Sequence, residues 1–317
     1  MSKKTTKKSD KGAWISKRLA ASAQQECNNA IKLLNKEKHD HVGEDVYEIR
    51  QNFKKIRALL RLARDEKDNY SRENKFFRDE ARKIASVRHA NSMIEGLDLI
   101  QQQYNERIYK KAFSDIRIHL EEHRDKEVEK VLQENHVLQD MHQNLEPRCE
   151  KTTSFFKGVD SFKTIGSGIK RVYKRGKKAH TKALNSKSTS NLHDLKKRVN
   201  YLIDQLDAIN PVWPKFLKAW SEELHELSAF LGSYRDLAML NDYLQENNTK
   251  ISTEDGAYLL GTLITGHQDQ LRKHAILLGK KLYYLDPKDF IALLEVAWET
   301  HASGMDKKLI PSDKLER

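Results

Sequence analysis

The sequence predicts an all-α protein. Its 317 residues include only five Pro and 13 Gly, and long segments contain neither. Apolar residues recur at spacings of three and four, the period of a helix with one buried face. The expected helices cover residues 12–38, 43–67, 71–87, 88–104, 105–145, 160–185, 190–209, 213–232, 234–247, 254–281 and 286–303.

Several helix ends have a local cause. Ser190 or Asn191 can cap the helix that opens at Leu192. Pro211 ends that helix, because a proline restricts the residue before it and cannot continue the hydrogen-bond ladder. The segment LDPKDF at 285–290 ends one helix and opens the last.

Two pairs of segments share a register. VYEIRQNFKKIRALLRL at 46–62 aligns with LHDLKKRVNYLIDQLDA at 192–208, and IASVRHANSMIEGL at 84–97 aligns with FLGSYRDLAMLNDYL at 230–244. Two pairs at nearly one offset indicate an internal repeat. We therefore predict two pseudo-symmetric antiparallel four-helix bundles with a basic groove or cavity between them. The predicted divisions are a disordered basic tail at 1–11, the bundles at 12–150 and 151–305, and a polar tail at 306–317.

The charge balance predicts a polyanionic partner. The chain has 58 Lys and Arg against 46 Asp and Glu, a formal net charge of +12. Cys27 and Cys149 have neither a CxxC partner nor metal-site spacing, so we expect two reduced thiols and a cytoplasmic protein. No apolar run approaches the roughly 20 residues of a membrane span. The basic N-terminus lacks the apolar segment of a signal peptide.

One helix face carries cations only. At 100° per residue, five side chains fall within about 80° of arc and span about 21 Å. These are Arg50, Lys54, Arg57, Arg61 and Arg64. We name them the basic stripe. Like charges at this spacing repel each other, so the stripe favours binding of a polyanion over an ordinary solvated face, on which signs usually alternate.

A second basic block covers 161–193, with nine Lys or Arg and no Asp or Glu. Gly166 and Gly168 suggest a helix start there, whose free N–H groups would favour anions. The block leads into His193, one turn before Lys196 and Lys197. A basic linker and a structural histidine are the alternative interpretations.

The motif LHDLKKRV and the basic segment GIKRVYKRGKKA before it resemble the second half of a CHAD domain, a conserved histidine α-helical domain. VYEIRQNFKKIRALLRL and SVRHANSMIEGL resemble its first half, so the likeness covers about 12–305. It implies a pair of four-helix bundles that bind inorganic polyphosphate without chemistry on it, and it allows localisation to polyphosphate granules.

The resemblance also implies which residues bind. In the first half they are Arg50, Lys54, Lys55, Arg57 and Arg61. In the second half they are Arg171, Tyr173, Arg175, Lys178, His193, Lys196 and Lys197. Arg88 and Arg235 match the late arginine of the family. In the first half, Tyr47 stands where the family has its histidine. In the second half, Asn200 and Tyr201 stand where the family prefers Lys or Arg, so this second arm of the groove is expected to bind more weakly or to bind a different anion.

Two other functions remain open. RNA binding shares the charge but would benefit from exposed aromatic side chains for base stacking. A metal-dependent phosphate-processing enzyme would need carboxylates near the cations, and Asp194 and Asp236 are the candidates to supply them. The segment HLEEH at 119–123 fits an inverted zinc-peptidase motif, but its helix is densely charged and no third ligand follows. We expect a binding protein that is not an enzyme, with no cofactor and no metal.

Overall fold

The computed structural model describes residues 13–36, 41–104, 113–134, 136–186, 188–247 and 254–304. Every regular element within these ranges is helical, which confirms the all-α class. The first part of the chain forms α1 (Ala13–Leu34), α2 (Val42–Leu60), the short 3-10 helix η1 (Arg61–Ala63), α3 (Tyr70–Lys83), α4 (Ala85–Tyr104), α6 (Ser114–Glu129), the π-turn η2 (Lys130–Glu134) and α7 (Val137–Ser154). The second part forms α8 (Phe162–Asn185), α9 (Thr189–Ala208), η3 (Asn210–Val212), α10 (Pro214–Glu246), α12 (Glu254–Leu282) and α13 (Pro287–Ser303).

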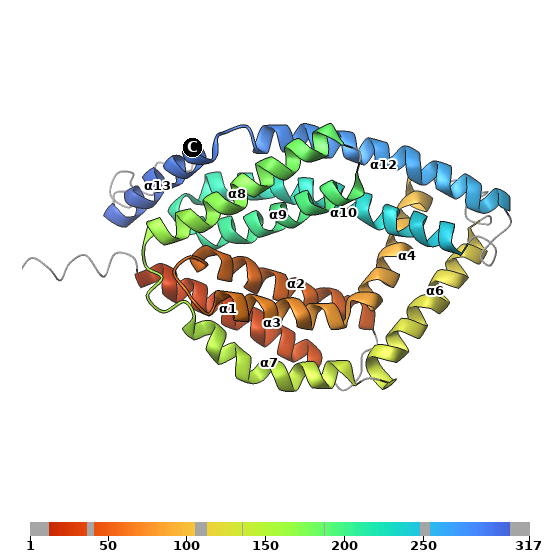
Figure 1. Cartoon of the computed structure of the whole chain (residues 1–317), viewed down its shortest axis with the longest axis horizontal. Coiled ribbons are helices and arrows are strands. Elements are labelled where there is room, and N and C mark those ends of the chain that lie inside the picture. Colours follow the sequence, from red (N-terminus) through yellow and green to blue (C-terminus); the bar gives the residue numbers. More distant parts are fainter. Residues whose placement is uncertain are drawn as a thin grey trace, which may run out of the picture.

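The helices fall into two groups that meet along α2 and α9 (Figure 1). In one group α1 packs on α2 and α7, and in the other α8 packs on α9 and α13. Helix α4 crosses to pack on α10, while α6 lies along α4 and α12 lies along α10. The buried amide of Gln205 on α9 donates to the carbonyl of Ala58 on α2 at 3.1 Å, so the two central helices are joined by a hydrogen bond as well as by apolar packing. The two-fold relation and the divisions at 12–150 and 151–305 remain predictions.

Several expected helices differ from the structure, and two of the differences are large. The single helix over 105–145 is wrong, because a π-turn follows α6 and His136, with φ 45°, separates it from α7. Residues 105–112 of that helix, like 1–12 and 305–317, lie outside the described residues. The expected break between 232 and 234 is also wrong, since α10 is continuous. Gly232 marks a close approach instead: a Cβ there would lie 2.8 Å from Nζ of Lys196.

The start of α8 corrects the interpretation of its glycines. Ser161 is the N-cap and its hydroxyl accepts from the amide of Thr164 at 3.2 Å, so Gly166 and Gly168 lie inside the helix and offer no free N–H groups. A Cβ on Gly168 would lie 2.6 Å from both Cα and O of Leu62. The glycine therefore lets the backbone of α8 touch the backbone of η1. Likewise, α9 begins after Ser188, two residues before the expected cap.

Two further expectations concern cysteines and membranes. Cys27 on α1 and Cys149 on α7 are buried free thiols, and the contact with Cys149 together with burial raises the pKa of Cys27. None of the described helices is both long and apolar enough to cross a bilayer.

Replacing Gly168 by Ala should destabilise the protein by about 1–3 kcal/mol, because the added methyl group meets backbone atoms that cannot rotate away. Urea unfolding measures the change. Gly266→Ala in α12 is the matched control: nothing lies within 4 Å of its Cβ position, so the better helix former should stabilise by up to about 1 kcal/mol. Equal effects at the two positions would contradict the close contact between α8 and η1.

Candidate polyanion-binding site

The basic stripe follows one side of α2 and η1, and its cations are satisfied by neutral groups. Arg50 donates to the carbonyl of Ala81 at the end of α3, a position where a helix favours a cation. Arg57 donates to Oδ1 of Asn74 at 3.2 Å. Lys54 donates to Oε1 of Gln51 at 3.3 Å. Among the described residues, no stripe side chain forms an ion pair with a carboxylate. The stripe therefore holds its positive charge without internal neutralisation.

Side chains from four helices gather around the first part of the stripe, and we name this group the central cluster. It consists of Arg50 and Lys54 from α2, Arg88 and His89 from α4, His193 and Lys196 from α9, and Arg235 from α10. The paired packing of α2 with α9 and of α4 with α10 brings these residues together. Segments about 146 residues apart in the chain thus contribute to one positively charged site.

The titration of the central cluster reflects its burial and its charge. Burial and the charges of neighbouring cations lower the pKa of Lys54 to about 7 and that of Arg50 to about 10. The same causes lower the pKa of His89 to about 4 and also lower that of His193. In the ligand-free protein, burial and the surrounding cations thus disfavour a positive charge on His193.

Two carboxylates enter the central cluster. Arg88 makes a two-pronged ion pair with Glu95, at 2.7 and 2.8 Å, and its Nη2 lies 3.9 Å from Oδ2 of Asp236. Burial raises the pKa of Asp236 despite the nearby cations, and its Oδ1 has no hydrogen-bond partner. These two acids offset only part of the positive charge of the cluster.

A second group of cations lies at the far end of the stripe, and we name it the arginine hollow. It is lined by Arg61, Arg64, Arg171, Arg175 and Arg198, with Gly168 and Val172 between them. Arg171 pairs with Asp65, and Arg198 donates to Asp194 at 3.0 Å. Arg57 lies between the two groups. Burial is the largest cause of the lowered pKa of both Arg50 and Arg61, and the positive charge of Arg57 contributes to both.

Tyrosine rings hold three of these arginines in place. The guanidinium of Arg61 lies 3.9 Å from the ring centre of Tyr201, and that of Arg64 lies 5.4 Å from Tyr70. Arg88 lies 5.1 Å from the ring of Tyr47, the residue at the family's histidine position. Stacking on a ring orients a guanidinium while its N–H edges stay available to an anion. Tyr201 and Tyr47 thus orient the guanidinium groups of Arg61 and Arg88, at positions where the resemblance implies Lys or Arg and His.

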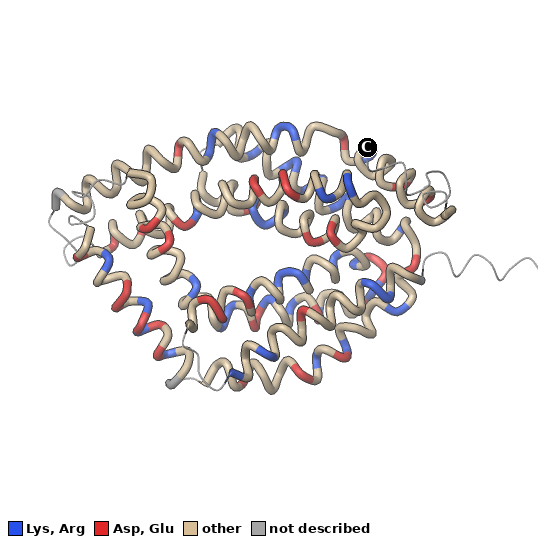
Figure 2. Tube along the Cα trace, turned by 180° about the vertical axis from the view of Figure 1, so that it is seen from behind, with Lys and Arg blue, Asp and Glu red and all other residues tan. Residues whose placement is uncertain are grey.

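Several cations elsewhere on the surface are paired with acids. Blue and red positions alternate along α6 in Figure 2. On α3, Arg78 and Arg82 both contact Asp79, at 2.8 and 3.5 Å. The stripe differs from these segments in that its cations lie side by side without such partners among the described residues.

Lys55 lies outside the site, against expectation. It follows Lys54 on α2 and therefore faces another side of the helix, where its Nζ lies 3.3 Å from Oε1 of Glu26. The hollow on that side also holds Asp204 and Asp207, so the charge of Lys55 is matched.

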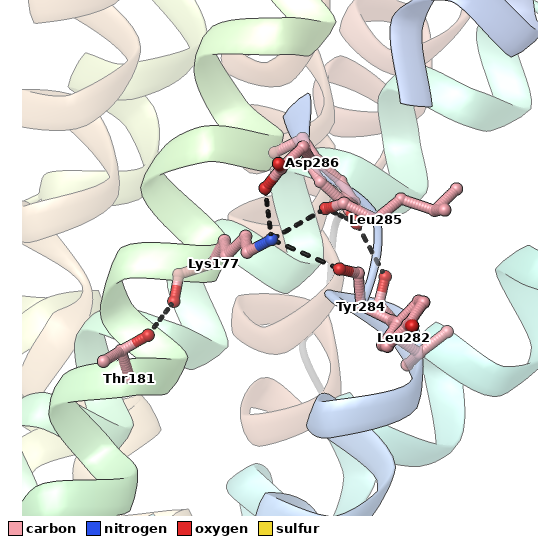
Figure 3. Close-up of polar contacts among 7 residues, drawn as sticks. Lys177, Thr181, Leu282, Tyr284, Leu285 and Asp286 are labelled. Carbon is pink, nitrogen blue, oxygen red and sulfur yellow. Dashed lines mark hydrogen bonds and ion pairs between the residues drawn. The ribbon is translucent and has the colours of Figure 1, made fainter. Parts of the chain in front are cut away.

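Tyr173 is not a ligand donor either. Its side chain is fully buried, its ring stacks on Phe290, and its hydroxyl donates to the carbonyls of Leu282 and Leu285 at 3.2 and 3.1 Å. Lys177 on the same side of α8 donates to the turn between α12 and α13 (Figure 3). This side of α8 anchors the C-terminal helices, while Arg171 and Arg175 project into the arginine hollow.

The remaining expected residues lie at the edges of the site. Lys197 is partly exposed and lies 3.4 Å from Asp194, next to His193. Lys178 is exposed on α8, one turn beyond Arg175. Neither belongs to the central cluster or to the lining of the arginine hollow.

Two residues of the site escaped the sequence analysis as individual binding residues. Arg198 follows Lys197 in the KKR block but points into the arginine hollow, where Arg61 and Arg175 lower its pKa along with burial. His89 follows Arg88 and lies near Arg235 of α10. Both residues are recognised as part of the site only from the packing of α4 on α10 and of α8 on α9. The spacing of residues within a single helix does not reveal them.

The HLEEH segment at 119–123, which fits a zinc-peptidase motif, lies against an aromatic side chain of α10. The rings of His119 and His123 lie 6.0 and 5.0 Å from the ring of Tyr243, so the HLEEH segment packs on α10. Across the described residues, no three His, Cys, Asp or Glu side chains are grouped in a way that could hold a metal ion.

Comparison with known families gives a match to the CHAD domain over residues 23–245. The range includes α2, α4, α9 and most of α10, and therefore every residue of the central cluster and of the arginine hollow. No curated protein matches the chain.

Replacing Lys54 by Met should raise the free energy of unfolding of the ligand-free protein at pH 7 by about 1 kcal/mol, because a buried unpaired ammonium is costly. The pKa of Lys54 is lowered from 10.5 to about 7 in the folded protein, so the unfolded chain binds more protons between these values. The cost is full below pH 7 and disappears as the pH approaches 10.5. Urea unfolding at several pH values should show the advantage of the variant shrinking over this range.

Lys55→Met is the control for this prediction. It removes a neighbouring lysine that is paired with Glu26 at 3.3 Å, so no gain in stability is expected. If both variants stabilise the protein equally at neutral pH, Lys54 does not carry the cost that its surroundings imply.

Proposed function

Because the chain belongs to the CHAD family, we propose that it binds inorganic polyphosphate through the central cluster and the arginine hollow, without chemical change of the polymer. The family is consistent with polyphosphate-related binding, and the arrangement of this chain's cations supports the specific surface. The proposal includes the localisation to polyphosphate granules that the family implies.

The observation that carries the proposal is the set of partly buried cations without carboxylate partners. Arg50, Lys54, Arg57 and Arg61 follow one side of α2 and η1, while Lys196 on α9 and Arg235 on α10 lie near the first two of them. None of these six cations has an ion-pair partner among the described residues. Burying like charges together costs free energy, which a bound anion would return. A polymer with a charge on every unit suits a continuous row of cations better than a single small anion does.

The aromatic side chains favour polyphosphate over RNA. Base stacking needs an open ring face. Tyr201 is buried beneath Arg61, and Tyr70 is buried beside Arg64. Tyr47 is partly exposed, but Arg88 lies over its ring. These rings orient guanidinium groups and offer little surface to bases.

The carboxylates near the cations favour binding over catalysis. Asp194 contacts Lys197 and Arg198, at 3.4 and 3.0 Å, and Glu95 pairs with Arg88. Each of these acids is therefore engaged by a cation on the protein. The proposal accordingly assigns them a structural role in positioning the cations.

Neutralising three stripe arginines should weaken polyphosphate binding at least a hundredfold, at about 1 kcal/mol for each charge-assisted contact. The variant is Arg50→Gln/Arg57→Gln/Arg61→Gln, and binding is measured by titration calorimetry over a series of salt concentrations. Three fewer phosphate contacts should also reduce the slope of log K against log salt by about 2.

The control is Arg72→Gln/Arg78→Gln/Arg82→Gln, which removes the same charge from arginines of α3 that contact acids. It should bind polyphosphate much as the wild type does. Equal weakening in both triple variants would mean that net charge, and not the stripe, determines affinity.

Polyphosphate should displace single-stranded RNA of equal total charge from the wild-type protein, because the site offers phosphate contacts without stacking surfaces. A competition assay with labelled RNA, at fixed salt, measures this preference. If RNA displaces polyphosphate instead, the ligand of the basic site is a nucleic acid.

A further inference from the structure

We propose that the central cluster takes up a proton when it binds a polyanion, and that the amine of Lys54 is the group that receives it. This inference rests on the proposed function, since it concerns the same site and the same class of ligand. It identifies a residue through which binding of polyphosphate would depend on pH.

Lys54 occupies a point where positive charge converges from four helices. Its Nζ has a single hydrogen-bond partner among the described residues, the neutral amide of Gln51 at 3.3 Å. The cations whose charge acts on it are Arg50 on α2, Arg88 on α4, Lys196 on α9 and Arg235 on α10. Removal of the proton from Lys54 is the easiest way for this group to reduce its own repulsion, because the arginines hold their protons far more tightly.

The other side of Lys54 opens on a hollow with few opposing charges. Its lining includes Glu48 and Lys55 on α2, Asp204 on α9 and His225 on α10. Burial raises the pKa of Asp204 to about 7, while Lys55 and Lys54 act against that rise. Asp204 is therefore partly protonated near neutral pH and does not act as a full counter-ion for Lys54. Within the cluster, Glu95 pairs with Arg88, and the charge of Asp236 acts on Lys196, Arg88 and Arg235. Neither acid is among the charges that act on Lys54.

A bound polyanion reverses the electrostatic balance. The pKa of Lys54 is about 7 in the free protein, so ammonium and amine are both populated near neutral pH. Negative charge beside the amine favours its protonated form and moves the pKa back toward its usual value, so a proton is taken up from solvent. His89, with a pKa of about 4, starts too low to contribute much at this pH. Asp204 lines the same hollow as Lys54 and would respond in the same direction, so the experiment has to separate the two groups.

The uptake has a consequence for affinity. The bound protein holds more protons than the free protein above pH 7, so binding weakens as the pH rises. For one proton the loss approaches tenfold for each pH unit above the pKa of the free lysine. Long polyphosphate chains are the appropriate probe, because most of their charge lies on internal units that do not titrate in this range.

The experiment is titration calorimetry of long-chain sodium polyphosphate into the full chain at pH 7.5, in two buffers with different ionisation enthalpies. The difference in heat between the buffers gives the number of protons taken up. The wild type should take up a substantial fraction of one proton, approaching one at pH 8.5. Lys54→Arg should show little uptake, because its guanidinium is already charged, and it should bind more tightly than the wild type above pH 8.

Lys55→Arg is the matched control, since the neighbouring lysine pairs with Glu26 outside the cluster. It should take up protons as the wild type does. Asp204→Asn separates the second titrating group, and uptake that disappears in this variant but persists in Lys54→Arg would overturn the assignment to Lys54.

The experiment distinguishes a failure of the proposed function from a failure of the proton-uptake inference. If polyphosphate gives no binding to the wild type at any pH, the proposed function is wrong. If it binds with the same number of protons, near zero, in the wild type and in Lys54→Arg, the function stands and the proton-uptake inference is wrong.

Discussion

Repulsion between cations that have no counter-ions is the constraint on which this structure depends. The basic stripe presents five positive side chains on one side of α2 and η1, and the central cluster adds others from α4, α9 and α10. Nothing in this group attracts its members to each other. The charges therefore have to be held by interactions outside the site, and the surrounding helices supply them.

Those interactions are short-range and lie behind the cations. Gln205 donates to the carbonyl of Ala58 between α9 and α2, and Arg18 on α1 donates at 2.8 Å to the carbonyl of Ala208 at the end of α9. Gly168 allows direct backbone contact between α8 and η1, directly beside the arginine hollow. On the other side of α8, the buried ring of Tyr173 fixes the turn before α13. These contacts behind the site hold the helices together against the repulsion between the cations.

The sequence predicted what a single helix determines and missed what helix pairing determines. The stripe from Arg50 to Arg64 follows from 100° per residue, and the all-α class follows from the spacing of apolar residues. Lys55 and Tyr173 lie apart from the other predicted binding residues, because the position of a basic or aromatic residue in a motif does not reveal which neighbour its side chain faces. The glycine at 168 signals a close contact with a helix about 100 residues earlier, which no local pattern contains. His136, with its positive φ, interrupts a segment that the spacing of apolar residues predicts as one helix.

The shape of the charge distribution argues for a polymer as the ligand. The central cluster and the arginine hollow lie at opposite ends of a stripe of about 21 Å, and Arg57 is electrostatically coupled to both. A small anion at one end would leave the other end unneutralised, and the repulsion there would remain. A flexible chain with a charge on each unit can neutralise both ends at once, and the second contact then costs little additional entropy. Continuity of the unpaired cations, more than their number, is what distinguishes this surface from an ordinary basic protein face.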